Sequence, residues 1–149
     1  MKLGLVTSNS INFSGYRIDP SLHLSEGAKV RCTLERSPYG LKSVDECSDK
    51  IFLGNIFSIN FVRSEEFGVT YLAASDTVLS NIERGKFISF KQAEQLAYLM
   101  LKENWILVTC SGTLGNVTFA NKSFCGKMAT HDLIRIIPND LKFKKGCLY

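Results

Sequence analysis

A loop of small and hydroxylated residues is the part of the chain best suited to contacting a ligand. Ser111-Gly112-Thr113-Leu114-Gly115-Asn116 follows the apolar run Ile106 to Val108. Glycine adopts backbone angles that other residues avoid, and its lack of a side chain lets a partner approach the main chain. Hydroxyls, amides and main-chain N–H groups commonly contact the phosphate and sugar oxygens of nucleic acids. A plain β-hairpin loop explains the same spacing, and from spacing alone it is the simpler interpretation.

Cys110, beside this loop, and His131-Asp132 are the residue types of a nucleophile with its base. The chain has only two histidines, and no Gly-x-Ser-x-Gly elbow precedes a helix. A cysteine at a strand end is usually a small buried hydrophobe. A Cys/His-dependent hydrolase therefore stays an alternative hypothesis, as does a non-catalytic protein-interaction module with an incidental basic surface.

Charge is unevenly placed along the 149 residues, whose net charge is +4. Residues 1–83 hold 8 Lys/Arg and 10 Asp/Glu, whereas residues 84–149 hold 10 and 4. A basic region attracts polyanions and speeds their arrival. The side chains suited to phosphate contact are Arg84, Lys86, Lys91, Lys122, Lys127, Arg135, Lys142, Lys144 and Lys145. Those suited to bidentate contact with base edges are Arg63, Asn81, Arg84 and Asn116.

Cysteine spacing and the lack of cofactor motifs exclude several function classes. The five cysteines are widely spaced without a Cys-x-x-Cys pair, so we expect reduced, mostly buried thiols and no zinc site. Neither Gly-x-Gly-x-x-Gly nor Gly-x-x-x-x-Gly-Lys occurs, so we expect no cofactor and no enzymatic activity. Without a run of about 18 apolar residues or a signal-peptide pattern, we expect a cytoplasmic protein that does not contact a membrane.

The elements that must position these residues are predicted to form an α+β fold in one domain spanning residues 1–149. Frequent Gly and Pro in residues 1–50 indicate an irregular arm with short strands or turns. The β-prone residues 51–62 and 68–73 are predicted to pair as antiparallel strands. The capping-box pattern and apolar periodicity of residues 89–104 predict one long helix packed on a mixed or antiparallel sheet.

Several stretches resemble the target recognition domain of the specificity (S) subunits of type I restriction-modification systems. Ile106–Gly115 matches the family's strand that ends in a Ser-Gly-Thr-Ile/Leu-Gly-like turn. His131–Ile136 matches the Leu-Ile-x-Ile-like strand that follows it. Two shorter stretches also match: Arg17-Ile18-Asp19-Pro20 and Tyr71–Asp76. The resemblance implies a DNA methylase specificity-domain-like fold. It also implies recognition of one half of a bipartite double-stranded DNA target.

The partners that the resemblance implies are an adenine methylase subunit and a restriction (motor nuclease) subunit, which carry out the chemistry. The DNA-binding residues that we expect are Ser111, Gly112, Thr113, Gly115, Asn116, Lys122, Lys127, Arg63, Arg84 and Lys86. In the family, a sequence like Gly146-Cys147-Leu148-Tyr149 begins a helix that precedes a strand and a long spacer helix. We therefore expect the chain to be a recognition domain truncated before these helices.

Overall fold

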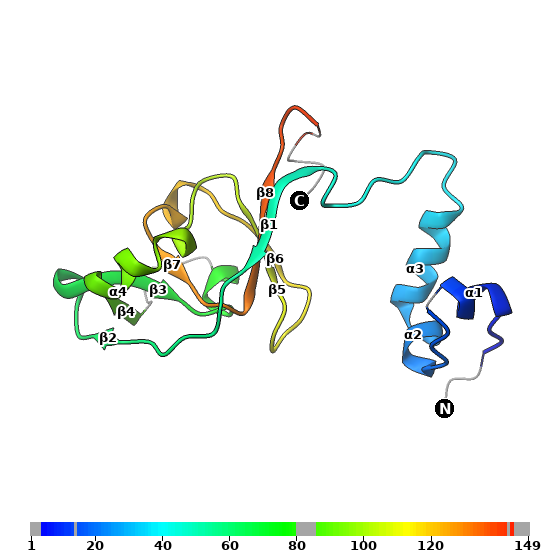
Figure 1. Ribbon diagram of the computed structural model, residues 1–149, viewed down its shortest axis with the longest axis horizontal. Helices are drawn as coiled ribbons and strands as arrows, with labels where there is room; N and C mark the ends of the chain where they lie inside the picture. The colour runs from blue at the N-terminus through cyan, green and yellow to red at the C-terminus, as the bar shows by residue number, and fades with distance from the viewer. Residues whose placement is uncertain (1–3, 14, 80–85, 143, 145–149) are drawn as a thin grey trace. The chain divides into compact units, whose positions relative to one another are not determined.

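The structure is a computed structural model, which describes residues 4–13, 15–79, 86–142 and 144. The chain divides into two compact units, Met1–Lys42 and Ser43–Tyr149, whereas the sequence led us to expect one domain. In Figure 1 the first unit runs from blue to cyan and the second from cyan to red. Each unit is described separately.

The first unit is helical, so the predicted irregular arm is wrong over this stretch. It contains α1 (Ser8–Phe13), α2 (Pro20–Leu24) and α3 (Glu26–Glu35). Asp19 caps α2 by accepting a hydrogen bond from the Ser21 amide at 2.9 Å, and Pro20 takes the first helical position. Ser25 caps α3 in the same way. These local caps decide the helix starts, whereas no residue of α2 or α3 is buried.

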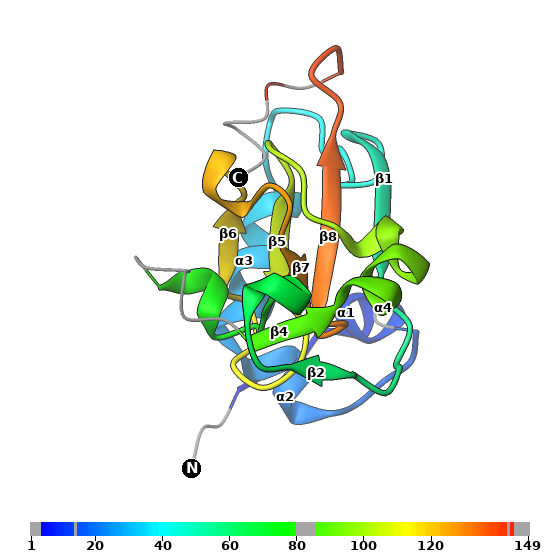
Figure 2. The same ribbon diagram turned by 90° about the vertical axis from the view of Figure 1, so that its left-hand side faces the viewer.

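The first sheet of the second unit is antiparallel throughout, with strand order β1-β8-β5-β6 (Figure 2). Its strands are β1 (Ser48–Leu53), β8 (Leu133–Pro138), β5 (Ile106–Thr109) and β6 (Val117–Phe119). The predicted strands after Trp105 and after His131 are therefore present. β5 and β6 form a hairpin whose tip is the glycine-containing loop.

The second sheet has the order β2-β4-β3-β7 and is mixed, because β7 runs parallel to β3. Its strands are β2 (Phe61–Val62), β4 (Lys86–Ser89), β3 (Gly68–Leu72) and β7 (Met128–Ala129). The predicted pairing of residues 51–62 with 68–73 is wrong. β1 pairs with β8 instead, and β4 lies between β2 and β3. Local alternation shows that a strand forms but does not determine its partner.

The long helix predicted over residues 89–104 is replaced by α4 (Phe90–Gln95) and the 3₁₀ turn η3 (Ala97–Leu99). Ser89 caps α4 as the sequence predicts, by accepting from the Gln92 amide at 3.4 Å. The helix ends because the chain beyond it bonds elsewhere: the Leu101 amide donates to the Lys127 carbonyl at 2.8 Å. Tertiary hydrogen bonding thus overrides helical propensity.

Two clusters of buried side chains form the core of the second unit. One lies against the first sheet and includes Leu72, Trp105, Leu107 and Leu133. The other lies against the second sheet, and Phe52 packs against both clusters. Three further 3₁₀ turns, η1 (Glu65–Phe67), η2 (Asp76–Val78) and η4 (Lys122–Phe124), complete the α+β fold. No helix in the described ranges has the length and apolar character needed to cross a membrane.

Candidate nucleic-acid interface

The hairpin tip between β5 and β6 has the backbone geometry that its glycines predict. Gly112 and Gly115 have φ of +73° and +82°, a region that L side chains rarely adopt. The Thr109 carbonyl accepts from the Gly115 amide at 3.2 Å, and the Thr109 amide donates to the Asn116 carbonyl at 2.9 Å. Residues 111–115 are exposed and Asn116 is half-buried. The tip therefore presents short polar groups and main chain to solvent.

A pocket of about 410 Å³ lies between this tip and the segment that follows β3. The segment is held against β6, because the Thr118 hydroxyl donates to the Thr77 carbonyl at 3.1 Å. The lining residues are Ala74, Ser75, Val78, Thr109, Ser111, Gly112, Thr113 and Asn116. None of these side chains is charged. The lining residues outside the loop were not individually predicted from the sequence as ligand-binding candidates.

Thr109 has an unusual position in this pocket. Its side chain is only 5% exposed, and its hydroxyl oxygen is buried without a hydrogen-bond partner among the described residues. Alternate residues of a strand point to the same side, so Thr109 shares the inward face of β5 with Leu107. Buried polar groups are nearly always paired, so this hydroxyl calls for a partner.

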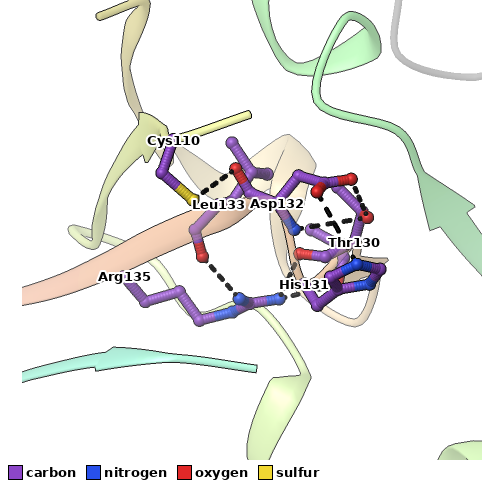
Figure 3. Close-up of polar contacts among 7 residues, drawn as sticks. Cys110, Thr130, His131, Asp132, Leu133 and Arg135 are labelled. Atoms are coloured by element: carbon purple, nitrogen blue, oxygen red, sulfur yellow. Dashed lines mark hydrogen bonds and ion pairs between the residues drawn. The ribbon is translucent and has the colours of Figure 1, made fainter. Parts of the chain in front are cut away.

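The turn between β7 and β8 is hydrogen-bonded to Cys110, the residue that precedes the tip (Figure 3). The carbonyl of Asp132 accepts from the amide of Cys110 at 3.0 Å and from its thiol at 3.2 Å. The same turn is fixed by Arg135, whose guanidinium donates to the carbonyls of Leu133, Ala129 and Thr130 at 2.8, 2.6 and 3.2 Å. The start of the hairpin loop is thus connected to a hydrogen-bonded network.

Arg135 is fully buried, so the prediction that it contacts phosphate is wrong. It occupies β8, opposite Phe52 on β1, whose ring centroid lies 5.9 Å from the guanidinium carbon. Burial lowers the pKa of Arg135. No carboxylate among the described residues forms an ion pair with it, so main-chain carbonyls take the place of a counter-ion. Alternation along β8, which puts Arg135 on the same face as the buried Leu133, is the signal that could have predicted this inward position.

The cations predicted to bind DNA lie in separate places. Lys122 and Lys127 belong to the η4 region, which follows β6 at the end of the hairpin away from the tip. Arg63 follows β2 directly after Val62, and Val62 pairs with the neighbour of Lys86, so Arg63 and Lys86 lie at one end of the second sheet. Arg84, Asn81 and Lys145 lie outside the described residues.

The overall charge of the second unit is small. Residues 43–149 hold 12 Lys/Arg and 11 Asp/Glu, because acidic residues earlier in the unit offset the basic second half. The unit therefore offers local cations rather than a strong positive field. Any contact with a polyanion must depend on where these few cations and the tip lie.

The residues of the alternative hydrolase hypothesis gather near the tip without forming a nucleophile and base. The Cys110 thiol donates a hydrogen bond to the main-chain carbonyl of Asp132. His131 Nε2 lies 3.6 Å from Asp132 Oδ1, while its buried Nδ1 has no partner among the described residues. Asp132 also accepts from the Thr130 hydroxyl at 3.0 Å. This geometry lacks the bond between thiol and imidazole that would activate a cysteine.

The expectation that the cysteines are mostly buried is wrong for two of them. Cys47 is buried and Cys110 is partly so, whereas Cys32 and Cys125 are exposed. The described residues contain no group of three or more His, Cys, Asp or Glu side chains placed to hold a metal ion. The described residues that line the pocket beside the hairpin tip have uncharged side chains.

Four residues of the pocket were missed as candidates by sequence reasoning: Ala74, Ser75, Val78 and Thr109. The first two belong to the stretch Tyr71–Asp76, which the family resemblance had already marked as a turn near the DNA side. Thr109 gave no local signal, because only the folded hairpin shows that its hydroxyl lacks a partner. A comparison of the chain with protein-family models found no match, and neither did a comparison with curated proteins.

Proposed function

We propose that this chain binds double-stranded DNA and recognises one half of a bipartite target, as part of the specificity subunit of a type I restriction-modification system. The observation that supports this function best is the exposed hairpin tip, where two glycines with positive φ present hydroxyls and main-chain groups to solvent. Such groups suit contact with phosphate and sugar oxygens. None of the described residues that line the adjoining pocket carries a carboxylate.

In this proposal, different residues do different parts of the binding. Ser111, Thr113 and the glycine main chain fix the register on the DNA backbone. Lys122, which is exposed, and Lys127, which is half-buried with its ammonium donating to the Ser123 carbonyl at 2.6 Å, contact phosphates. Each neutralised phosphate steepens the salt dependence of binding by about one unit of log–log slope. Asn116 and Arg63 are the side chains suited to adenine and guanine edges in the major groove.

The chemistry of modification and cleavage belongs, in this proposal, to the adenine methylase and motor nuclease subunits with which such a subunit assembles. The tip then needs rigidity rather than reactivity. The hydrogen bonds from Cys110 to Asp132, and from Arg135 to the turn around it, supply a fixed base for the loop. A rigid base lets a small contact surface keep one orientation on the duplex.

The test compares two glycine substitutions that impose the same backbone strain. Gly112 lies at the tip, and Gly15 lies in the first unit with φ of +67°; a Cβ added at either would meet open space. Gly112→Val is expected to weaken retention of a labelled random-sequence duplex at low salt by at least tenfold, measured by fluorescence anisotropy. Gly15→Val is expected to change it by less than threefold.

Folded fractions of the two variants are matched by circular dichroism before binding is measured. Equal losses for both variants would contradict the placement of the tip at the interface. Failure of the unmodified chain to retain any duplex at low salt, together with retention of a protein partner, would favour the interaction module instead.

A further inference from the structure

The proposed contacts to the DNA backbone use only one side of the pocket beside the hairpin tip, the side formed by Ser111, Gly112 and Thr113. We infer that the pocket accepts an uncharged nucleobase turned out of the duplex, an inference that rests on the proposed function. The pocket opens next to the tip residues that the proposal places against DNA. A base leaving the helix beside the tip would enter it directly.

The volume and lining of the pocket fit a small neutral ligand. At about 410 Å³ it falls within the range of about 300–1,000 Å³ that small-molecule sites occupy. Ala74 and Val78 supply apolar surface, which suits the faces of a base. Ser75, on the side of the pocket opposite the tip, supplies a hydroxyl that suits the edge of the base.

The buried hydroxyl of Thr109 is the observation that points to a ligand. A buried polar group without a partner destabilises a fold, and such groups are rare. Thr109 lines the pocket from the inward face of β5, and its oxygen has no partner among the described residues. The oxygen has almost no accessible surface, so it can bond a ligand only after the Thr109 side chain rotates toward the pocket. A base edge, which carries both donors and acceptors, then suits this hydroxyl in either role.

The charge of the lining argues for a base and against a phosphate. Phosphate recognition in proteins uses Arg, Lys or converging main-chain N–H groups, because an anion removed from water needs compensating charge. No lysine or arginine is among the lining residues that the structure describes. The base must be unpaired, because its hydrogen-bonding edge is occupied in a duplex; enzymes that extrude bases read that edge in the same way.

The experiment titrates each of the four deoxynucleosides, which carry no phosphate, into the full ¹⁵N-labelled chain. Saturable shifts are expected in the amide signals of Thr109, Ser111 and Asn116 for at least one nucleoside. Inorganic phosphate at equal ionic strength is expected to leave the Thr109 signal unchanged, because the proposed phosphate contacts lie at the tip. Absence of saturable shifts with every nucleoside, or an equal shift of the Thr109 signal with phosphate, would overturn the inference.

Two variants that remove one hydroxyl each separate binding from folding. Thr109→Val is expected to weaken nucleoside binding about tenfold, the effect of one lost hydrogen bond, while urea unfolding shows stability unchanged or raised. Ser48→Ala removes a buried hydroxyl that donates to the Val44 carbonyl at 2.6 Å, on the edge strand opposite β6, so it is expected to lower stability and leave nucleoside affinity within threefold. Unchanged nucleoside affinity in Thr109→Val would overturn the inference.

Duplex retention by the unmodified chain is measured in parallel by anisotropy. Retention of duplex without any nucleoside binding overturns this inference and leaves the proposed function standing. Nucleoside binding without duplex retention overturns the proposed function, and with it the claim that the base comes from DNA.

Discussion

The buried guanidinium of Arg135 gives the sharpest test of how the hairpin is supported. Arg135→Met keeps most of the side-chain volume but removes the donors to three main-chain carbonyls, at 2.6 to 3.2 Å. A buried acceptor left without a partner costs about 1–3 kcal/mol. Removing the charge offsets part of this loss of stability, because burial disfavours the charged guanidinium and lowers the pKa of Arg135. We expect a net loss of about 3 kcal/mol in the free energy of unfolding.

Urea unfolding followed by tryptophan fluorescence measures this change, because Trp105 lies in the adjacent core cluster. Arg135→Lys is the matched control for charge. It keeps the positive charge but lacks the forked donors, so it is expected to be destabilised as well. A variant Arg135→Met as stable as the unmodified chain would refute the reasoning, because apolar replacement of a buried ion is neutral only where no acceptor is left unpaired.

The remaining predictions concern other parts of the fold. Hydrogen bonds from Ser21 hold the pKa of the Asp19 carboxyl below its ordinary value. The ionised carboxylate therefore stabilises helix α2 fully above the ordinary carboxyl pKa, and this stabilisation is lost as the pH falls through the lowered pKa. Asp19→Asn should remove this pH dependence of helix content, measured by circular dichroism. Gly68→Ala should destabilise the second unit by about 3 kcal/mol in urea, because the added Cβ would collide with the Ile88 carbonyl oxygen; wild-type stability would contradict this close approach. Peptide mapping after brief alkylation should find Cys125 modified and Cys47 protected, and fast modification of Cys47 would contradict its burial.

Local signals in the sequence predicted those features that depend on a few neighbouring residues. The strands around the tip, the cap at Ser89 and the positive φ of Gly112 and Gly115 are confirmed. Each depends on backbone preference or on a short hydrophobic pattern, which the sequence carries directly.

Features that depend on distant partners were not predicted. The helix over residues 89–104 is cut short because the amide of Leu101 bonds to Lys127, far along the chain. Arg135 was assigned to phosphate because its residue type favours that role, whereas the strand face that it occupies points inward. The helices of residues 8–35 were missed because Gly and Pro outweighed the capping signals at Asp19 and Ser25.

The separation of the candidate cations follows from the same limit. Lys122 and Lys127 follow the loop closely in the sequence. In the fold, β6 runs away from the tip, so both lysines lie at the opposite end of the hairpin. Only strand pairing shows that Arg63 and Lys86 share one end of the second sheet. A basic stretch in sequence therefore becomes several small cationic places in the fold.

The central claim is that the hairpin tip lies against duplex DNA. Chemical-shift mapping of the full ¹⁵N-labelled chain during titration with a duplex selected from a random pool tests it most directly. The largest shifts are expected on residues 111–116, with smaller shifts near Arg63 and Lys86. Shifts confined to residues remote from the tip, or no selected duplex and no shifts at low salt, would contradict it.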